Sequence, residues 1–474
     1  MRLVIISLGL LVWLNAQVYE NPYPKNAYLA SADNAQTSDI QNETTSDLDN
    51  EQTESAQSES EESIGRTFTL AELIEGAKKN YSLEAKDLAI LQAQANKSGA
   101  YSEFMPTIDG SYQYQYNNNP YMRIDGHTGN VKANWEFFSG LKTYNKVREK
   151  QSLYRASLED KETTKDQLFL SIIEQYYTYF TNRARFLSLD HKRIQLQANV
   201  KRVERLFKAG LTTIDDLESL RAELLTTEHD IESVRLDIEK NKLTLSWLTN
   251  SDVGSLERKT IKTPVFNLNE NRHDLNMLTY QAAGSKYQAR QMTYLPTIGI
   301  SDSYSLNSGF GQGLHMKGDM GMPGMPANAD MSSFILRSYP SYQNVVMVTA
   351  SIHLDALTTY RQYEAARLGY LQMLKNLAYK KEEQKKDERV YRKSLEIAAT
   401  KIKASEAALR SANIAFENVA KKYDAQILNF IDYLSSLTKK FEAEATYNQA
   451  LNDYEMQKAY YIYYSGQDLQ EHIE

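Results

Sequence analysis

The residues best suited to metal chemistry lie in a methionine- and glycine-rich segment from Ser308 to Ser333, "SGFGQGLHMKGDMGMPGMPANADMSS". Thioether sulfur and imidazole nitrogen are ligands for Cu(I), which makes this segment a candidate metal site. Its candidate ligands are His315, Met316, Met320, Met322 and Met325. The same composition is typical of a flexible extracellular loop that binds no metal, and we favour that interpretation.

No other motif indicates an enzyme or a cofactor. The 7 histidines are scattered and none forms HExxH, and "GFGQG" lacks the lysine and the preceding buried strand of a phosphate-binding loop. The chain has no cysteine, which excludes disulfides and thiol chemistry. We therefore predict that the protein is not an enzyme and has no cofactor.

The N-terminal region differs from the rest in composition. Met1-Arg2 and the apolar run "LVIISLGLLVWL" predict a secretory signal peptide over residues 1–16, or alternatively an N-terminal membrane anchor. Residues 17–66 are predicted to be a disordered acidic linker, because Ser31 to Ser63 holds ten acidic residues and no basic ones. Without them the net charge of −7 becomes about +3, which excludes a strongly basic nucleic-acid surface.

The remaining chain holds two copies of one unit, residues 67–272 and 273–466, followed by a short tail at 467–474. "FMPTIDGSYQYQY" from Phe104 is echoed by "YLPTIGISDSYSL" from Tyr294, and "FSGLKTYNKV" and "AGLTTIDDL" have counterparts in the same order. Each copy predicts a helix, two strands and a long helical hairpin. The strands are predicted at 106–117, 130–138, 296–307 and 343–355, and the hairpins at 141–249 and 358–464.

The hairpins are predicted to be coiled coils. No proline or glycine occurs from Leu141 to Lys208, enough for about 100 Å of helix. The return helix shows alternating steps of three and four residues, which is heptad periodicity. This seam consists of Leu217, Leu220, Leu224, Thr227, Ile231, Val234, Ile238, Asn241, Leu245 and Leu248.

The strands have the length and alternation of tilted transmembrane β-strands, with one apolar or aromatic face and one polar face. The predicted lipid-facing residues are Ile108, Tyr112, Tyr114, Tyr116, Val131, Trp135, Phe137, Val346, Val348 and Ile352. A soluble sheet with one buried face is the alternative interpretation. Asp302 falls on the apolar side of its strand, and we expect a bulge or an inward turn there.

Four strands cannot close a barrel, and an open sheet edge cannot exist in lipid because its N–H and C=O groups find no partner. Several chains must therefore share one barrel, and three chains would contribute twelve strands in total, about the usual range. The predicted fold is mainly α with a transmembrane β part. A trimeric barrel with four strands per chain continues into a long α-helical coiled-coil tunnel.

These features together resemble the TolC-like outer-membrane efflux protein family. The resemblance rests on the doubled strand starts, "FFSGLKTYNKV" and "AGLTTIDDL", and covers nearly the whole chain after the linker. It implies a homotrimer in the outer membrane of a Gram-negative cell, with a helical tunnel in the periplasm. It also implies a passive exit duct that docks with a periplasmic adaptor protein and an inner-membrane pump of RND, ABC or MFS type.

The resemblance further implies a narrow tunnel entrance at the two helix–helix turns. Asp432 corresponds to a constricting aspartate, Tyr423 to a tyrosine that links neighbouring helix pairs, and Asp215 to its partner. The family's arginine and second aspartate are replaced by Leu428 and Ser435, which puts the closing network in doubt. Asp215 alternatively serves only as a first-turn carboxylate that suits the helix dipole.

Efflux of small toxic compounds is the favoured function. Type I protein secretion is an alternative, and a secreted coiled-coil structural or adhesion protein is an alternative of a different class. A periplasmic adaptor would have one helical hairpin flanked by β-rich domains, which the doubled hairpin argues against. The sequence identifies neither the exported substrate nor the pump.

Overall fold

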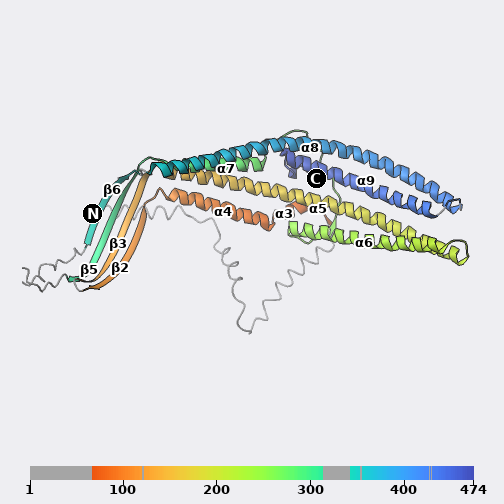
Figure 1. The fold of residues 1–474 in the computed structure, drawn as a ribbon, viewed down its shortest axis with the longest axis horizontal. Coiled ribbons are helices and arrows are strands. Elements are labelled where there is room, and N and C mark those ends of the chain that lie inside the picture. Colours follow the sequence, from red (N-terminus) through yellow and green to blue (C-terminus); the bar gives the residue numbers. More distant parts are fainter. Residues whose placement is uncertain are drawn as a thin grey trace, which may run out of the picture. The chain divides into compact units, whose positions relative to one another are not determined.

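The computed structural model describes residues 67–473, apart from 120–121, 313–341, 353–354, 426 and 429. The predicted signal peptide, the acidic linker and the candidate metal ligands lie outside the described residues. All described elements belong to one compact unit, residues 63–474. Within it, Figure 1 shows a sheet at one end of a set of long helices, with the two helix–helix turns at the other end.

The sheet is antiparallel, and its strand order is β2-β3-β5-β6. Its strands are β2 (Thr107–Asn119), β3 (Met122–Ser139), β5 (Thr297–Gln312) and β6 (Tyr342–Ser351). β3 begins well before the predicted start at 130, because it pairs with β2 residue by residue from Asn119↔Met122 onward. β6 ends at Ser351, short of the predicted end at 355.

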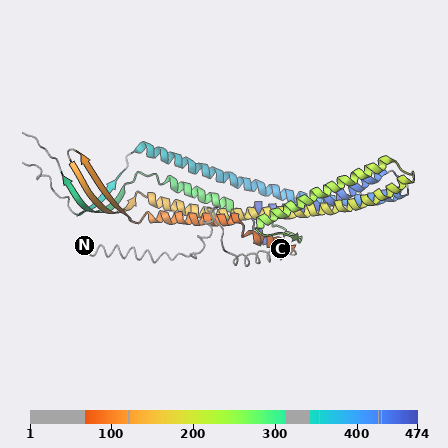
Figure 2. The ribbon, with the colours of Figure 1, turned by 90° about the horizontal axis from the view of Figure 1, so that it is seen from below.

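Each pair of strands is followed by a long helical hairpin (Figures 1 and 2). The first is α5 (Lys142–Lys208) with α6 (Ile214–Thr249), and the second is α8 (Ala356–Asp424) with α9 (Phe430–Ser465). Gly140 and Leu141 both have positive φ, 60° and 66°, which turns the chain sharply from β3 into α5. A side chain at Gly140 would place its Cβ 2.8 Å from the Leu295 carbonyl oxygen, so only glycine fits this turn.

The heptad seam of α6 faces the protein interior. Eight of its ten residues are buried, and Leu220 and Leu245 are fully covered, as knobs-into-holes packing requires. The helix begins at a cap in which the Thr213 side chain accepts a hydrogen bond from the backbone N–H of Asp216.

Three shorter helices accompany the hairpins: α3 (Leu70–Ala77), α4 (Tyr81–Ser102) and α7 (His273–Ala289). The single helix predicted before the first strand is thus divided. The break falls at Asn80, whose side chain caps α4 and also donates to the Leu248 carbonyl oxygen at 2.9 Å. α3 starts with a full capping box between Thr69 and Glu72, which accounts for a stable helix of only eight residues.

The largest apolar core lies beside the middle of α5. It joins the apolar faces of α3 and α5 to the ends of α6 and α9 and to the connector, which we define as residues 251–272 between α6 and α7. Tyr176 and Tyr177 are fully buried in this core. A short parallel pairing of β1 (Thr67–Phe68) with β4 (Ser255–Leu256) closes one side of it.

Side chains hold the connector in place through its backbone. The Tyr176 hydroxyl donates to the carbonyl of Glu257 and accepts from the N–H of Lys259, and Tyr177 donates to the Lys259 carbonyl. A buried Glu455–Lys458 ion pair then binds both the N–H and the C=O of Ile261, at 2.8 and 2.9 Å. Burial raises the pKa of Tyr176 to about 12, so this contact stays neutral at physiological pH.

Candidate functional site

The strand register places the predicted lipid-facing residues on one face of the sheet, apart from Phe137, which lies in a β-bulge. Residues directly opposite each other in an antiparallel pair share a face. Ile108 is opposite Ala133, Gly110 is opposite Val131, and Val131 is in turn opposite Tyr304. On the next pair, Ile300 is opposite Val348 and Asp302 is opposite Val346, so the same face continues across all four strands.

All ten predicted lipid-facing side chains are exposed in the single chain. Their exposed fractions lie between 45% for Trp135 and 73% for Tyr112. No part of the described chain covers this face, which we call the apolar face. A continuous apolar face that its own chain leaves uncovered is a surface for lipid or for another protein.

A β-bulge leaves Phe137 without an opposite residue on β5, so the register does not place it on the apolar face as predicted. The register between β3 and β5 shifts between Trp135 and Phe138, and Phe138 rather than Phe137 stands opposite Ile298. The Phe137 ring still packs edge-on against the Trp135 ring, at 5.8 Å between centroids. The Trp135 indole N–H donates to the Phe104 carbonyl oxygen at 3.0 Å, at the end of the sheet where the helices start.

The opposite face of the sheet is mostly polar and carries its own hydrogen bonds, although Val345 and Met347 of β6 also lie on it. Asn130 accepts from the hydroxyls of Ser303 and Ser305, and Thr128 donates to Asn307 across β3 and β5. Asn134 donates to the Asp109 carboxylate at 3.3 Å on the β2 side. This polar face suits contact with water, whereas the apolar face does not.

Asp302 does not occupy the bulge or inward turn expected for it. β5 pairs in unbroken register through this residue, between Ala133 on β3 and Val346 on β6. Asp302 therefore lies on the apolar face, where it is exposed. Nothing in the structure explains a carboxylate at this position.

The sheet ends in two open edges, β2 and β6. Among the described strands, neither edge pairs with a further strand of this chain, so each has a row of backbone N–H and C=O groups directed outward. Such edges pair with another chain, or are covered by one, in stable proteins.

The predicted entrance residues lie at the two helix–helix turns, far along the helices from the sheet (Figure 1). Asp215 is exposed in the first turn of α6, and Asp432 is exposed in the first turn of α9. Both therefore lie where a carboxylate interacts favourably with the helix dipole. Tyr423 is partly buried in the last turn of α8.

The contacts around Tyr423 involve residues that the sequence did not single out. Its ring stacks on the Tyr433 ring of α9, with centroids 4.6 Å apart, and the Arg202 guanidinium of α5 lies 5.1 Å from the Tyr423 centroid. Asn199 of α5 donates to the Tyr433 hydroxyl at 3.1 Å. We call Asn199, Arg202, Tyr423 and Tyr433 the tip cluster; it joins the two hairpins of one chain.

The tip cluster rests on an apolar layer formed by both hairpins. Leu196 and Val203 of α5 and Leu217 and Leu220 of α6 pack with Tyr433, Leu437 and Phe441 of α9. No sequence signal could have identified Arg202, because its partner lies on the other repeat and the pairing depends on tertiary packing.

In the described part of the chain, no group of three or more histidine, cysteine, aspartate or glutamate side chains is arranged to hold a metal ion. None of the described helices has an apolar stretch long enough to cross a membrane.

Comparisons with known proteins agree with this architecture. Residues 75–251 match the family model of the outer membrane efflux protein. A search of curated protein sequences gives no match.

Three solved structures show the likeness of fold. CusC, whose crystal structures concern folding and transmembrane channel formation, has 14% identity and a TM-score of 0.71, covering 86% of this chain and 94% of CusC. The Campylobacter jejuni outer membrane channel CmeC has 15% identity and a TM-score of 0.71, with 85% and 88% covered. The Vibrio cholerae outer membrane protein VceC has 15% identity and a TM-score of 0.70, with 84% and 96% covered.

The resemblance noted in the sequence is thereby confirmed: residues 75–251 match the outer membrane efflux protein family model, and most of the chain has the fold of solved outer membrane channels. Its location is the outer membrane of a Gram-negative cell, with the helical part in the periplasm.

Proposed function

We propose that this outer membrane efflux protein is the passive exit duct of a tripartite export system, and that three copies build it. The observation that carries the proposal is the four-stranded sheet with one uncovered apolar face and two open edges. Three such sheets joined edge to edge form a barrel of about twelve strands, which removes every open edge. The apolar face then contacts lipid and the polar face lines a water-filled lumen.

The long hairpins continue the duct into the periplasm. Side by side around a common axis, three copies of α5–α6 and α8–α9 form a hollow helical tunnel. A periplasmic adaptor and an inner-membrane pump would supply its cargo, and small toxic compounds are the cargo class that we favour.

We place the tunnel entrance at the helix–helix turns. Three copies of Asp432 around one axis would repel each other and would favour bound cations. The tip cluster would hold the two hairpins of each chain together beside this ring, with Arg202 supplying the basic group that is absent at Leu428. Asp215 would lie at the neighbouring turn of the first hairpin.

Edge-to-edge assembly can be tested with introduced cysteines, because the chain has none of its own. We would combine Ser111→Cys on β2 with Val345→Cys, Met347→Cys or Thr349→Cys on β6. One of the three pairs should cross-link neighbouring chains into a covalent trimer in outer membranes. The control pair, Ser111→Cys with Asn130→Cys, lies opposite within one chain and should give only an internal disulfide.

The export function can be tested with a deletion strain and its complement. Loss of the protein should raise the accumulation of cationic dyes and drugs, and the wild-type gene should restore efflux. Secreted proteins are measured in parallel. A secretion defect without drug accumulation would favour protein secretion, and no change in either would contradict the export function.

A further inference from the structure

The two repeats meet around a polar cavity of about 150 Å³. α5 contributes Asp166, the end of the connector and the start of α7 contribute Arg272 and His273, and the segment after α9 contributes Asp468. The cavity lies at the junction of the repeats and outside the proposed barrel and entrance. We call it the repeat junction.

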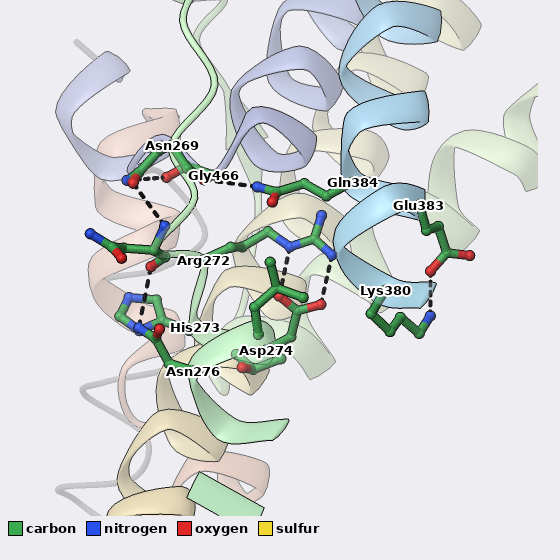
Figure 3. A network of polar contacts seen from close by, with 12 residues as sticks. Asn269, Arg272, His273, Asp274, Asn276, Lys380, Glu383, Gln384 and Gly466 are labelled. Atoms are coloured by element: carbon green, nitrogen blue, oxygen red, sulfur yellow. Dashed lines mark hydrogen bonds and ion pairs between the residues drawn. The ribbon is translucent and has the colours of Figure 1, made fainter. Parts of the chain in front are cut away.

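The backbone around the repeat junction is tightly fixed. The Asn269 N–H donates to the Ser465 carbonyl oxygen at 2.8 Å, and its side chain donates to the Gly466 carbonyl oxygen at 2.9 Å. Gln384 of α8 donates to the Asn269 carbonyl oxygen at 2.8 Å (Figure 3). Gly466 has φ of 80°, and a Cβ there would lie 2.7 Å from the Asn269 carbonyl oxygen, so the two segments are in close contact.

Two ionisable side chains, His273 and Asp166, line the repeat junction. His273 places Nδ1 2.7 Å from Glu159 Oε2, an ion pair only when the imidazole is protonated. Burial raises the pKa of Asp166 to about 6, and repulsion from Asp468 and Glu162 adds to the effect, whereas His273 and Lys165 oppose it.

The other charged groups near the junction have partners of their own. Arg272 makes a two-pronged ion pair with Asp274, with both N···O distances 2.6 Å (Figure 3). α4 packs on the same part of α5, where Lys86 pairs with Asp160 and Asp87 pairs with Lys161. Burial also raises the pKa of Tyr463, which therefore stays neutral.

We propose that the repeat junction is a pH-sensitive contact between the two repeats, which mild acid tightens through Asp166 and His273. A carboxyl group with a higher pKa in the folded chain binds its proton more tightly there than when unfolded. Its burial therefore destabilises the fold above about pH 6, and this penalty disappears as the pH falls from about 7 toward 3.8. Protonation of His273 turns its contact with Glu159 into an ion pair, so acid strengthens this contact between α5 and α7 as well.

The test compares thermal unfolding of the full-length purified protein and its variants at about pH 8 and about pH 5.5. Asp166→Asn imitates the protonated acid. It should melt several degrees above the wild type at the higher pH, and this difference should become smaller at the lower pH. His273→Gln should match the wild type at the higher pH and melt below it at the lower pH.

Asp87→Asn is the matched control. The Asp87 carboxylate on α4 is exposed, and it pairs with Lys161, which lies on α5 close to Asp166. This variant should shift the melting temperature equally at both pH values. If Asp166→Asn and His273→Gln behave like this control, the proposal is wrong.

Hydrogen exchange of the wild type gives a readout that needs no variant. After correction for the intrinsic rates, backbone amides of residues 267–274 should be more protected at about pH 5.5 than at about pH 8. Equal or lower protection in acid would overturn the proposal even if the Asp166 variant did not fold.

Discussion

The two longest helices, α5 and α8, are the first helices of the two hairpins and occupy equivalent places in the two predicted repeats, yet their surroundings differ. α5 has 18 buried residues and packs against α3, α4, α6, α7 and α9. α8, of similar length, has five buried residues among those described, and its main contacts are with α7 and α9. The chain therefore has a self-covered centre around α5, and an uncovered region formed by α8 and the sheet.

This difference separates two sources of stability. The centre is stabilised by apolar burial within one chain, at about 25 cal/mol per Å². The uncovered region keeps large apolar side chains exposed, including Leu368, Val390 and Ile397 on α8. In the proposed assembly, lipid or another copy of the chain covers these side chains and supplies the free energy of burial. Substitutions in the centre should accordingly lower the stability of the single chain, whereas substitutions in the uncovered region should impair membrane insertion or association between chains.

The largest effect is expected on the apolar face of the sheet. Val348→Arg should abolish insertion into the outer membrane, since an arginine facing lipid near mid-depth costs about 2–4 kcal/mol per chain. Thr349→Arg, the next residue on the polar face, is the control and should insert normally. The amount of trimer in outer-membrane fractions measures both, and equal insertion would show that the apolar face does not contact lipid.

In the centre, Leu220→Ala should lower the free energy of unfolding by about 3 kcal/mol, because it leaves a cavity where a fully buried side chain stood. The loss should be seen in urea unfolding of the detergent-solubilised protein. Thr226→Ala on the exposed side of α6 should change it by less than about 0.5 kcal/mol. Similar losses for both would mean that the heptad seam does not stabilise the hairpin.

On α8, Leu395 and Ile397 allow a direct comparison of a buried and an exposed apolar residue on the same helix. Leu395 is 4% exposed and Ile397 is 58% exposed in the single chain. Leu395→Ala should lower the unfolding free energy of the chain itself. Ile397→Ala should instead weaken trimer association by about 1–2 kcal/mol per interface, which native mass spectrometry at decreasing concentration would reveal. An unchanged trimer in Ile397→Ala would place the neighbouring copy elsewhere.

The smallest effect concerns the tip cluster, where the centre meets α8. Arg202→Gln and Tyr423→Leu should show a coupling of about 1 kcal/mol in a double-mutant cycle, as expected for a partly exposed cation–π contact. Arg205→Gln is the control, since Arg205 is exposed on the same helix and should not couple to Tyr423. The current through single channels should rise in Arg202→Gln if the cluster narrows the entrance.

Much of the architecture could be predicted from the sequence because it depends on periodic patterns. The heptad seam from Leu217 to Leu248 and the alternating strand from Ile108 to Tyr116 are local signals, and each describes one face of one element. The start of β3 was missed because Gly126, Gly129 and the polar residues around them have low strand propensity. Pairing with β2 and β5 overrides that propensity.

Contacts between the repeats could not be predicted in this way. The bulge at Trp135–Phe138, the tip cluster and the repeat junction each depend on residues far apart in the sequence. No periodicity identifies such pairs, since their geometry is set only when the elements pack. The functional roles of Asp215, Tyr423 and Asp432 likewise came from the family resemblance alone and remain predictions.

The connector is bound at alternate residues, Glu257, Lys259 and Ile261, each through backbone atoms and each by a side chain from a helix. The connector is therefore bound with a period of two residues, as a β-strand is, but its partners are tyrosine, glutamate and lysine side chains instead of a neighbouring strand. Inserting one amino acid here would put every one of these bonds out of phase at once. Lengthening by two would let the pattern re-form one step along, so this stretch should tolerate only even changes in length.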